Sequence, residues 1–324
     1  MQGKETALQV ARQVGSLLGS LFLASVIIFV LLRLLPGDSA GTSLGVGTTA
    51  EQLEQLRAEL GTDQPLYVQY WQWIHGLVTG QSESFVSRRP FGELIAHRLT
   101  ITVPLSLAAF ILAVVISTPL GIIAATRRRS KIGLTISALS QFGLAVPAFW
   151  IGIILVWIFA LRLGWYPAGG FPRRGWADPG AAIAALTLPA VTIAIAMSAT
   201  MVRYIRSSII DVLDTDYLRT ARALGYSQSQ ALWRHGIRNA TVPVIAILGI
   251  ELGTSLLGAV VIENVFALPG LGQLLLSSVN ARDLPVVLNL IMMLTAVILI
   301  LNFLVDQLQR VIDPRLRLTN RSAS

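Results

Sequence analysis

The residue types that most often carry enzymatic chemistry are few in this chain and lie far apart along it. The stretch "GTSLG", residues 41–45, matches the Gly-x-Ser-x-Gly pattern of hydrolase nucleophiles. That pattern acts only on a sharp strand-to-helix turn with a histidine base in reach, and neither is expected here. The histidines, His75, His97 and His235, are widely separated and are predicted on different sides of a membrane. We therefore expect neither a catalytic triad nor a metal site.

Two further chemistries are excluded by composition. The chain has no cysteine, so it offers no disulfide, thiolate metal site or cysteine nucleophile. It also lacks the Gly-x-x-x-x-Gly-Lys-Ser/Thr phosphate loop, so it does not hydrolyse ATP by that route. No cofactor of its own is expected.

One carboxylate, Glu251, falls near the middle of a long apolar stretch, "AILGIELGTSLLG". Such a group is costly in lipid and usually faces a cavity or a partner. It is therefore a candidate for lining a transport pathway, although a hydrogen bond to a neighbouring helix would also explain it. Gly249 and Gly253 flank it as Gly-x-x-x-Gly and predict close helix packing there, as Gly15 and Gly19 do earlier in the chain.

The elements that must position these residues are long apolar segments. The 324 residues are 54% hydrophobic and only 13% charged, whereas soluble domains carry about 25% charged residues. Six segments have the roughly 20 apolar residues that a helix needs to cross a membrane: 13–35, 99–126, 132–161, 182–202, 241–262 and 284–305. The fold class predicted is an all-α membrane protein with six transmembrane helices.

The basic residues predict the orientation of these spans. Most of them fall on one side if the N-terminus is cytoplasmic, as the positive-inside rule requires: Lys4, Arg12, Arg127, Arg128, Arg129, Lys131, Arg203, Arg206, Arg219, Arg222, Arg234, Arg238, Arg310, Arg315, Arg317 and Arg321. The other side holds Arg57, Arg88, Arg89, Arg98, Arg173, Arg174 and Arg282. We predict that both termini are cytoplasmic, and we attribute the +8 charge to topology and anionic lipid rather than nucleic acid.

The first span raises the alternative of a cleaved signal peptide. Its apolar core exceeds the usual 7 to 15 residues, although the small residues of "PGDSAGTS" follow it. An uncleaved signal anchor is the preferred interpretation.

The segment 36–98 is too long for a plain loop and predicts a small external helical layer. Thr48 and Glu51 form a capping-box pattern for a first helix that ends at Gly61. A second helix follows, with Asp63 as its cap and Pro65 in its first turn. The apolar positions of the second helix recur with helical spacing at Tyr67, Tyr70, Trp71 and Ile74.

A polar insert, "DYLRTARALGYSQSQALWRHGIRNATVPV", separates the fourth and fifth spans. A helix is predicted through "DYLRTARAL", a stop at Gly225, and a second helix after Ser227, which forms a capping box with Gln230. The arginines of the insert are Arg219, Arg222, Arg234 and Arg238, and Ala221 and Ala223 keep part of its surface low. The outline is also that of a DNA-reading helix-turn-helix, but its tether to two spans argues against nucleic acid.

This insert and other motifs resemble the inner-membrane permease subunits of bacterial ABC importers of the dipeptide and oligopeptide type. The family signature is E-A-A, three residues, G, nine residues, I-x-L-P. Arg219, Thr220 and Ala221 stand at the E-A-A positions, Gly225 at the glycine, and His235, Gly236, Ile237 and Arg238 at the last four. Further matches are "LLPGD", "LGTDQPLYVQY", "GAVVIENVFALPGLGQLL" and "DPRLR". The chain departs from the family at Asn264, where threonine is frequent, and near "GQSES".

The resemblance implies a type I ABC importer permease fold in a bacterial inner membrane. The partners implied are a second homologous permease, two ATP-binding subunits that hold ATP and magnesium, an external substrate-binding protein and membrane lipid. The insert would be the coupling helix that contacts the ATPase through Arg219, Thr220, Ala221, Arg222, Ala223, Gly225 and Tyr226. The pathway candidates are Glu251, Glu263 and Asn264.

The corresponding division of the chain is 1–35 for the N-terminal segment and first span, 36–98 for the external layer, 99–317 for the permease core with the insert at 207–240, and 318–324 for the tail. Relatives carry di- and oligopeptides, nickel, glutathione or haem. The arginines of the insert are explained equally well by the positive-inside rule alone. The rival function is an ion-gradient-driven carrier or channel that works without an ATPase, but the internal repeat usual in such carriers is not found.

Overall fold

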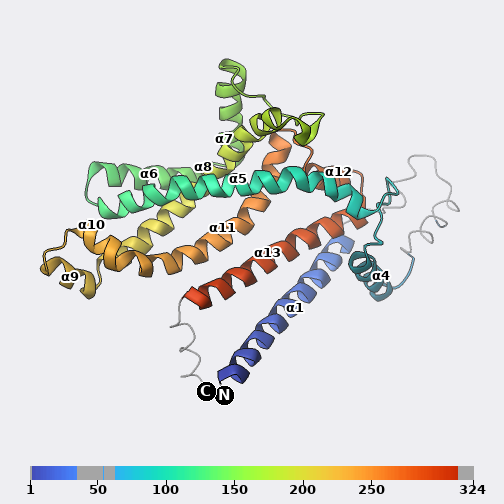
Figure 1. Ribbon diagram of the computed structural model, residues 1–324. Coiled ribbons are helices and arrows are strands. Elements are labelled where there is room, and N and C mark those ends of the chain that lie inside the picture. The colour runs from blue at the N-terminus through green and yellow to red at the C-terminus, as the bar shows by residue number, and fades with distance from the viewer. Residues whose placement is uncertain (1, 35–53, 55–62, 313–324) are drawn as a thin grey trace. The chain divides into compact units, whose positions relative to one another are not determined.

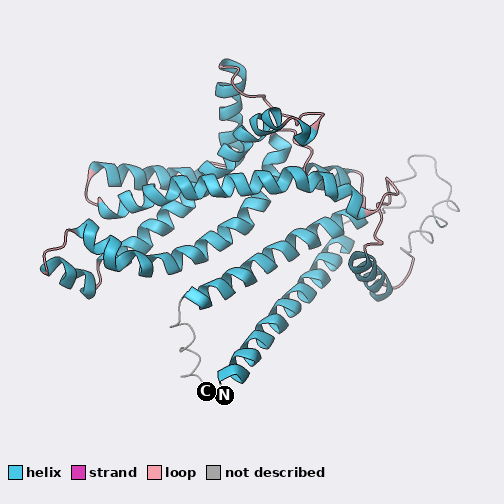
Figure 2. Ribbon diagram, in the orientation of Figure 1, coloured by secondary structure: helices cyan, strands magenta, loops and turns pink. Residues whose placement is uncertain are grey.

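The computed structural model describes residues 2–34, 54 and 63–312, almost all of them helical (Figure 1; Figure 2). Within those ranges the only β pairing is an isolated bridge between Glu83 and Pro90. Several predictions lie outside the described residues. They are the "GTSLG" match, the helix expected after Thr48, the "DPRLR" motif and the tail at 318–324.

Five helices are long and apolar enough to cross a membrane. They lie within α1 (Gln2–Leu34), α5 (Phe91–Thr126), α8 (Pro179–Leu213), α11 (Ile237–Val265) and α13 (Leu284–Ile312). Each contains one of the predicted spans, and a bent helix pair brings the number of candidate spans to six. The prediction of six spans is therefore confirmed if that pair crosses as one unit.

The bent pair corrects the third predicted span, 132–161. It consists of α6 (Lys131–Ala145) and α7 (Ala148–Leu155), the latter continued by a π-helical turn, η1 (Val156–Arg162), and the two parts meet at 101°. Pro147 causes the break because it has no N–H and forces the residue before it out of the helical region. Val146 is accordingly extended, with φ −89° and ψ 121°.

The described chain forms two compact units. The first comprises Met1–Ile101 and Pro269–Ile300, and the second comprises Thr102–Leu268 and Leu301–Ser324. In the first unit, a core cluster joins three helices: Phe29 of α1, Trp73 of α4 (Leu66–Thr79), and Leu288 and Met292 of α13. The Trp73 indole donates to Asn289 Oδ1 at 2.8 Å, and Asn289 Nδ2 donates to Ser82 Oγ at 2.6 Å.

Helix α4 confirms the second helix predicted in the external layer and corrects its details. Its N-cap is Pro65, with no side-chain capping bond, so the prediction that Asp63 caps it is wrong. Tyr70 and Ile74 pack against the core cluster, whereas Tyr67 and Trp71 are 69% and 62% exposed. The buried aromatic is instead Trp73.

In the second unit, α6, α7 and α11 all pack against α8. One face of α8 is lined by small and aliphatic side chains such as Ala194, Met201 and Ile205, which are nearly or fully buried. Two further short elements are η2 (Gly175–Ala177) and, in the first unit, α12 (Leu271–Asn280).

Glycines allow the closest helix contacts of the second unit. A Cβ at Gly121 would lie 2.6 Å from Ile205 Cγ2, and one at Gly249 would lie 2.3 Å from Val305 Cγ2. The close packing predicted at Gly249 is therefore confirmed. At Gly15 and Gly19 a Cβ would meet nothing within 4 Å, so this chain supplies no described partner at that motif.

Gly249→Ala is expected to destabilise the helix packing, because the β-branched Val305 side chain has no flexible end that could move aside. The expected cost is about 1–3 kcal/mol in the free energy of unfolding, typical of overpacking. Thermal unfolding in detergent measures it. Gly258→Ala on the same helix is the matched control, since its Cβ would lie 3.5 Å from Ile193 Cγ2, and equal melting of both variants would contradict the prediction.

Candidate functional site

The polar insert forms a two-helix elbow, defined here as α9 (Asp216–Ala223), the turn at Gly225 and α10 (Gln228–Ala231). The local sequence rules predicted this shape correctly. Gly225 has φ +95°, a left-handed conformation that favours glycine. The capping box is also present, since the Gln230 N–H donates to Ser227 Oγ at 3.3 Å and the Ser227 N–H donates to Gln230 Oε1 at 3.0 Å.

The elbow runs without interruption into a membrane-spanning helix. Helix α10 passes through a π-helical turn, η3 (Leu232–Gly236), into α11, which gives one apolar helical segment over Gln228–Val265. Helices α10 and α11 are therefore parts of one continuous helical path.

Small and apolar side chains hold the elbow against the end of α8. Leu218 and Leu232 are 1% and 0% exposed. The absence of a side chain at Gly236 makes this possible, because a Cβ there would lie 2.9 Å from Val212 Cγ1 and 3.3 Å from Leu218 Cδ1. Tyr217 adds a polar contact, since its hydroxyl accepts a hydrogen bond from Asn239 Nδ2 at 3.0 Å.

The structure divides the predicted coupling residues between two faces of the elbow. Arg219, Thr220, Arg222, Ala223 and Gly225 are exposed, and Arg219 pairs with Asp216 at 3.1 Å. The expectation that Ala221 belongs to the exposed low surface is wrong, because it is 6% exposed and packs inward.

Tyr226 braces the turn of the elbow rather than extending its outer surface. It is half-buried. Its ring lies edge-on to His235, with centroids 5.8 Å apart, and the Arg234 guanidinium lies 5.6 Å from the Tyr226 ring.

Leu224 is a surface residue of the elbow that the sequence reasoning did not single out. Its side chain is 76% exposed at the C-terminal end of α9. The available signal was an apolar residue directly before the stop glycine of an otherwise polar helix. With Ala223 and Arg222 beside it, Leu224 gives the tip of the elbow a mixed apolar and cationic surface suited to a protein partner.

A second feature that sequence reasoning missed is an ion pair that links two turns of the second unit. Arg128, in the turn after α5, donates two hydrogen bonds to Asp214, at 2.9 Å to Oδ2 and 3.0 Å to Oδ1. From its position in a basic turn, Arg128 was expected only to set the orientation of the spans. The hydrogen bond from Arg128 holds the pKa of Asp214 below its ordinary value. The pair therefore persists above the ordinary aspartate pKa of about 3.9 and is lost only as the pH falls through the lowered value.

The three pathway candidates do not come together. Glu251 is 8% exposed, and within the described residues it has no hydrogen-bond partner. Glu263 lies twelve residues further along α11, about 18 Å away at helical rise. It is fully buried and accepts a hydrogen bond from Thr102 Oγ1 at 2.5 Å, while Asn264 is exposed and donates to the Val260 carbonyl at 3.0 Å.

No group of three or more histidine, aspartate or glutamate side chains that could hold a metal ion is found in the described parts of the chain. Of the pathway candidates, Glu251 is a buried carboxylate without a hydrogen-bond partner among the residues that the structure describes, whereas Glu263 accepts a hydrogen bond from Thr102.

Loss of the Arg128–Asp214 pair is expected to loosen the start of the elbow. Arg128→Gln should raise the deuterium uptake of backbone amides in 215–224, because the turn after α5 no longer holds Asp214. The double variant with Arg128→Asp and Asp214→Arg should restore protection. Arg127→Gln, in the same exposed turn, serves as control, and uptake equal to wild type in Arg128→Gln would refute the role of the pair.

Comparison with known protein families agrees with this architecture. Residues 117–318 match the family described as "Binding-protein-dependent transport system inner membrane component", and residues 7–108 match its N-terminal counterpart. The glutathione transport system permease protein GsiC of Escherichia coli (strain K12) is 38% identical over 312 residues, covering 95% of this chain and 98% of the relative. A putative peptide transport system permease protein of Brucella abortus (strain 2308) is 37% identical over 314 residues, with the same coverage.

Solved structures show the same fold for the larger part of the chain. An inward-facing structure of the MetNI methionine ABC transporter aligns with a TM-score of 0.58 at 16% identity, covering 68% of this chain and 97% of that one. An amino acid ABC transporter crystallised with histidines aligns with a TM-score of 0.53 at 20% identity, covering 68% and 94%. The chain belongs to the binding-protein-dependent transport system inner membrane components, the membrane permease subunits of ABC importers.

Proposed function

We propose that this permease imports small peptides, from glutathione-sized tripeptides to oligopeptides, and that the elbow couples it to ATP hydrolysis. The observation that carries the coupling role is the unbroken helical path from α10 into α11. The substrate class is supported by the two relatives, whose names specify glutathione and peptide, over 95% of this chain.

Permeases of this family work with ATPase subunits and a substrate-binding protein, and hydrolysis takes place in the separate ATPase subunits. We add the finer composition as part of the proposal: a second, homologous permease, two ATP-binding subunits that hold ATP and magnesium, and a binding protein on the opposite side. The exposed basic residues near the elbow support an orientation with both termini in the cytoplasm. Membership in an importer family argues against the ion-gradient-driven carrier considered from the sequence.

The mechanical role follows from the packing of the elbow. Closure of the ATPase subunits would move the tip formed by Arg222, Ala223 and Leu224, whose side chains are exposed. Leu218 would transmit this displacement because its side chain is buried and lies close to Gly236. Rigid-body motion of the elbow then tilts α11 against α8 and changes access to the pathway.

Glu251 is proposed as a pathway residue. It is a buried carboxylate on α11, unpartnered among the described residues. Facing the pathway between two permeases would give it water or the amino group of a peptide as a partner. The same argument does not extend to Glu263, whose carboxylate is occupied by Thr102.

Gly225→Pro is expected to abolish coupled transport while leaving membrane insertion intact. Proline fixes φ near −65°, whereas Gly225 has φ +95°, and it removes the N–H that donates to the Arg222 carbonyl at 3.1 Å. The loss should be on the order of tenfold or more, as expected for a distorted turn. Peptide uptake and ATP hydrolysis stimulated by the binding protein are measured with the reconstituted complex.

Gln228→Pro is the matched control for this variant. Gln228 is the first residue of α10, where proline is well tolerated. Ser227 before it already has φ −63° and ψ 158°, which suits a residue that precedes proline. Normal coupled uptake by Gly225→Pro, or equal loss in both variants, would contradict the coupling role of the elbow turn.

Glu251→Leu is expected to lower peptide uptake on the order of tenfold at unchanged protein level, because it removes a polar group from the proposed pathway. Glu251→Gln should fall between this variant and the wild type, since it keeps hydrogen bonding without charge. The measurement is initial uptake of a labelled tripeptide into proteoliposomes. Wild-type uptake by Glu251→Leu would exclude the residue from the pathway.

A further inference from the structure

A cavity of about 290 Å³ lies in the first unit, between the end of α1, helix α4, the loop after it and the start of α13. Its polar lining includes two guanidinium groups, Arg33 and Arg88, the carboxylate of Glu83 and the amides of Gln72 and Gln81. Counting these charged groups, the lining has a net charge of +1. This cavity is distant in sequence from the elbow and plays no part in the proposed coupling.

Arg33 brings a buried hydrogen-bond donor to this cavity. It ends the apolar segment Ala11–Arg33 of α1, and its guanidinium carbon lies 5.5 Å from the centre of the Phe29 ring. Its Nε is buried and has no hydrogen-bond partner in the part of the chain that the structure describes. A buried donor without an acceptor is unfavourable, and because Arg33 lines the cavity, an acceptor oxygen held there would complete its bonding.

The surroundings of Arg33 identify a lipid as the source of that oxygen. An apolar stripe of α1 leads up to it, formed by Leu23, Ile27 and Val30, whose side chains are 59%, 47% and 45% exposed. This stripe offers a path for an acyl chain directly below the guanidinium. A guanidinium fork matches the paired oxygens of a phosphate, and a phosphodiester carries the single negative charge that the lining lacks.

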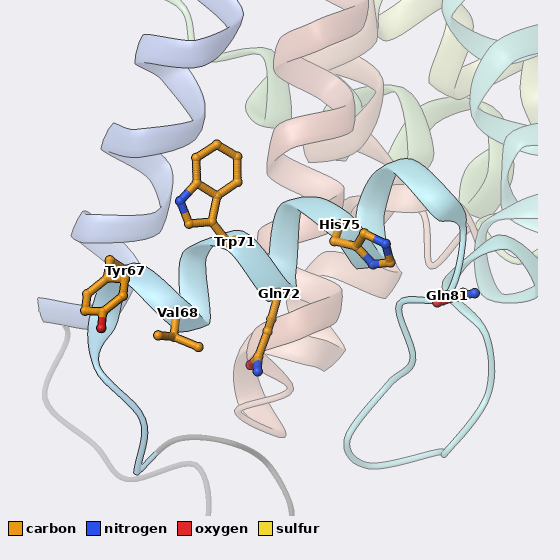
Figure 3. Close-up of a pocket in the computed structure, with 7 residues that line it drawn as sticks. Tyr67, Val68, Trp71, Gln72, His75 and Gln81 are labelled. Carbon is orange, nitrogen blue, oxygen red and sulfur yellow. The ribbon is translucent and has the colours of Figure 1, made fainter.

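An adjoining surface groove also indicates that the cavity lies at the level of the lipid headgroups. Tyr67, Trp71 and His75 line it on one face of α4 (Figure 3). The groove shares Gln72, Gly76 and Gln81 with the cavity. Exposed tyrosine and tryptophan side chains are typical of the headgroup layer.

We propose that this cavity binds the phosphodiester headgroup of a phospholipid, with the Arg33 guanidinium as its principal donor and an acyl chain lying along Leu23, Ile27 and Val30. The occupant is a structural lipid of the first unit rather than a transported substrate. The proposal is independent of the substrate and coupling roles given above.

Native mass spectrometry of the full-length chain, purified with its partner subunits and delipidated in detergent, tests the proposal by titration with phosphatidylglycerol. The wild-type chain should bind one phosphatidylglycerol molecule tightly during this titration. Arg33→Gln should weaken that binding about tenfold or more, the range of a charge-assisted hydrogen bond. Arg89→Gln should stay within about twofold, since this arginine lies outside the cavity lining and pairs with Glu93 at 3.3 Å.

Two further titrations of the wild type identify the ligand even if Arg33→Gln fails to fold. Diacylglycerol with the same acyl chains lacks the phosphate and should bind at least about tenfold more weakly. Inorganic phosphate at the lipid concentration should not displace the lipid. Equal affinity in Arg33→Gln, equal binding of diacylglycerol, or displacement by inorganic phosphate would each overturn the assignment of a phospholipid site.

Discussion

The constraint on which the permease depends is that its backbone must satisfy its own hydrogen bonds wherever lipid surrounds it. Each span is therefore a helix that cannot unravel cheaply, and a displacement at one end reaches the other. The elbow uses this property because α10 is not joined to α11 by a loop. The π-helical turn at Leu232–Gly236 keeps the path helical while shifting its register by one residue. It also presents Gly236 to Val212 and Leu218, which fixes the elbow to the adjacent helix α8.

The prolines of the spans show that the surrounding residues decide whether a helix continues through a proline or breaks there. Pro104, Pro119, Pro189 and Pro243 all lie inside long helices of the structure, yet Pro147 divides a predicted span with a bend of 101°. Sequence alone did not distinguish these cases, because each proline removes the same N–H and the outcome depends on neighbours that can compensate. The six apolar segments were thus predictable from length and hydropathy, whereas the shape of the third was not.

In the candidate site, too, the features that depend on neighbouring residues were predictable from sequence, and those that depend on long-range contacts were not. Gly225, Ser227 and Gln230 act within a few residues, so rules for turns and caps predicted the elbow correctly. The burial of Ala221 depends on how the elbow packs against the rest of the second unit. The Arg128–Asp214 pair joins residues 86 positions apart, and an exposed basic turn gives no sign of its partner. Nothing in the sequence around Glu263 indicated its hydrogen bond from Thr102, so Glu263 was named as a pathway candidate beside Glu251.

Polar pairing also explains how the first unit holds α4 and the loop after it around a small apolar cluster. Phe29, Trp73, Leu288 and Met292 form a small cluster. It is reinforced by Trp73 donating to Asn289, by Asn289 donating to Ser82, and by Ser84 donating to Asp283. Where water is largely excluded, each of these hydrogen bonds fixes the relative position of the two segments that it joins, because breaking it leaves a buried polar group unpaired. The loop after α4 is therefore held against the start of α13, where it forms part of the polar wall of the cavity beside Arg33.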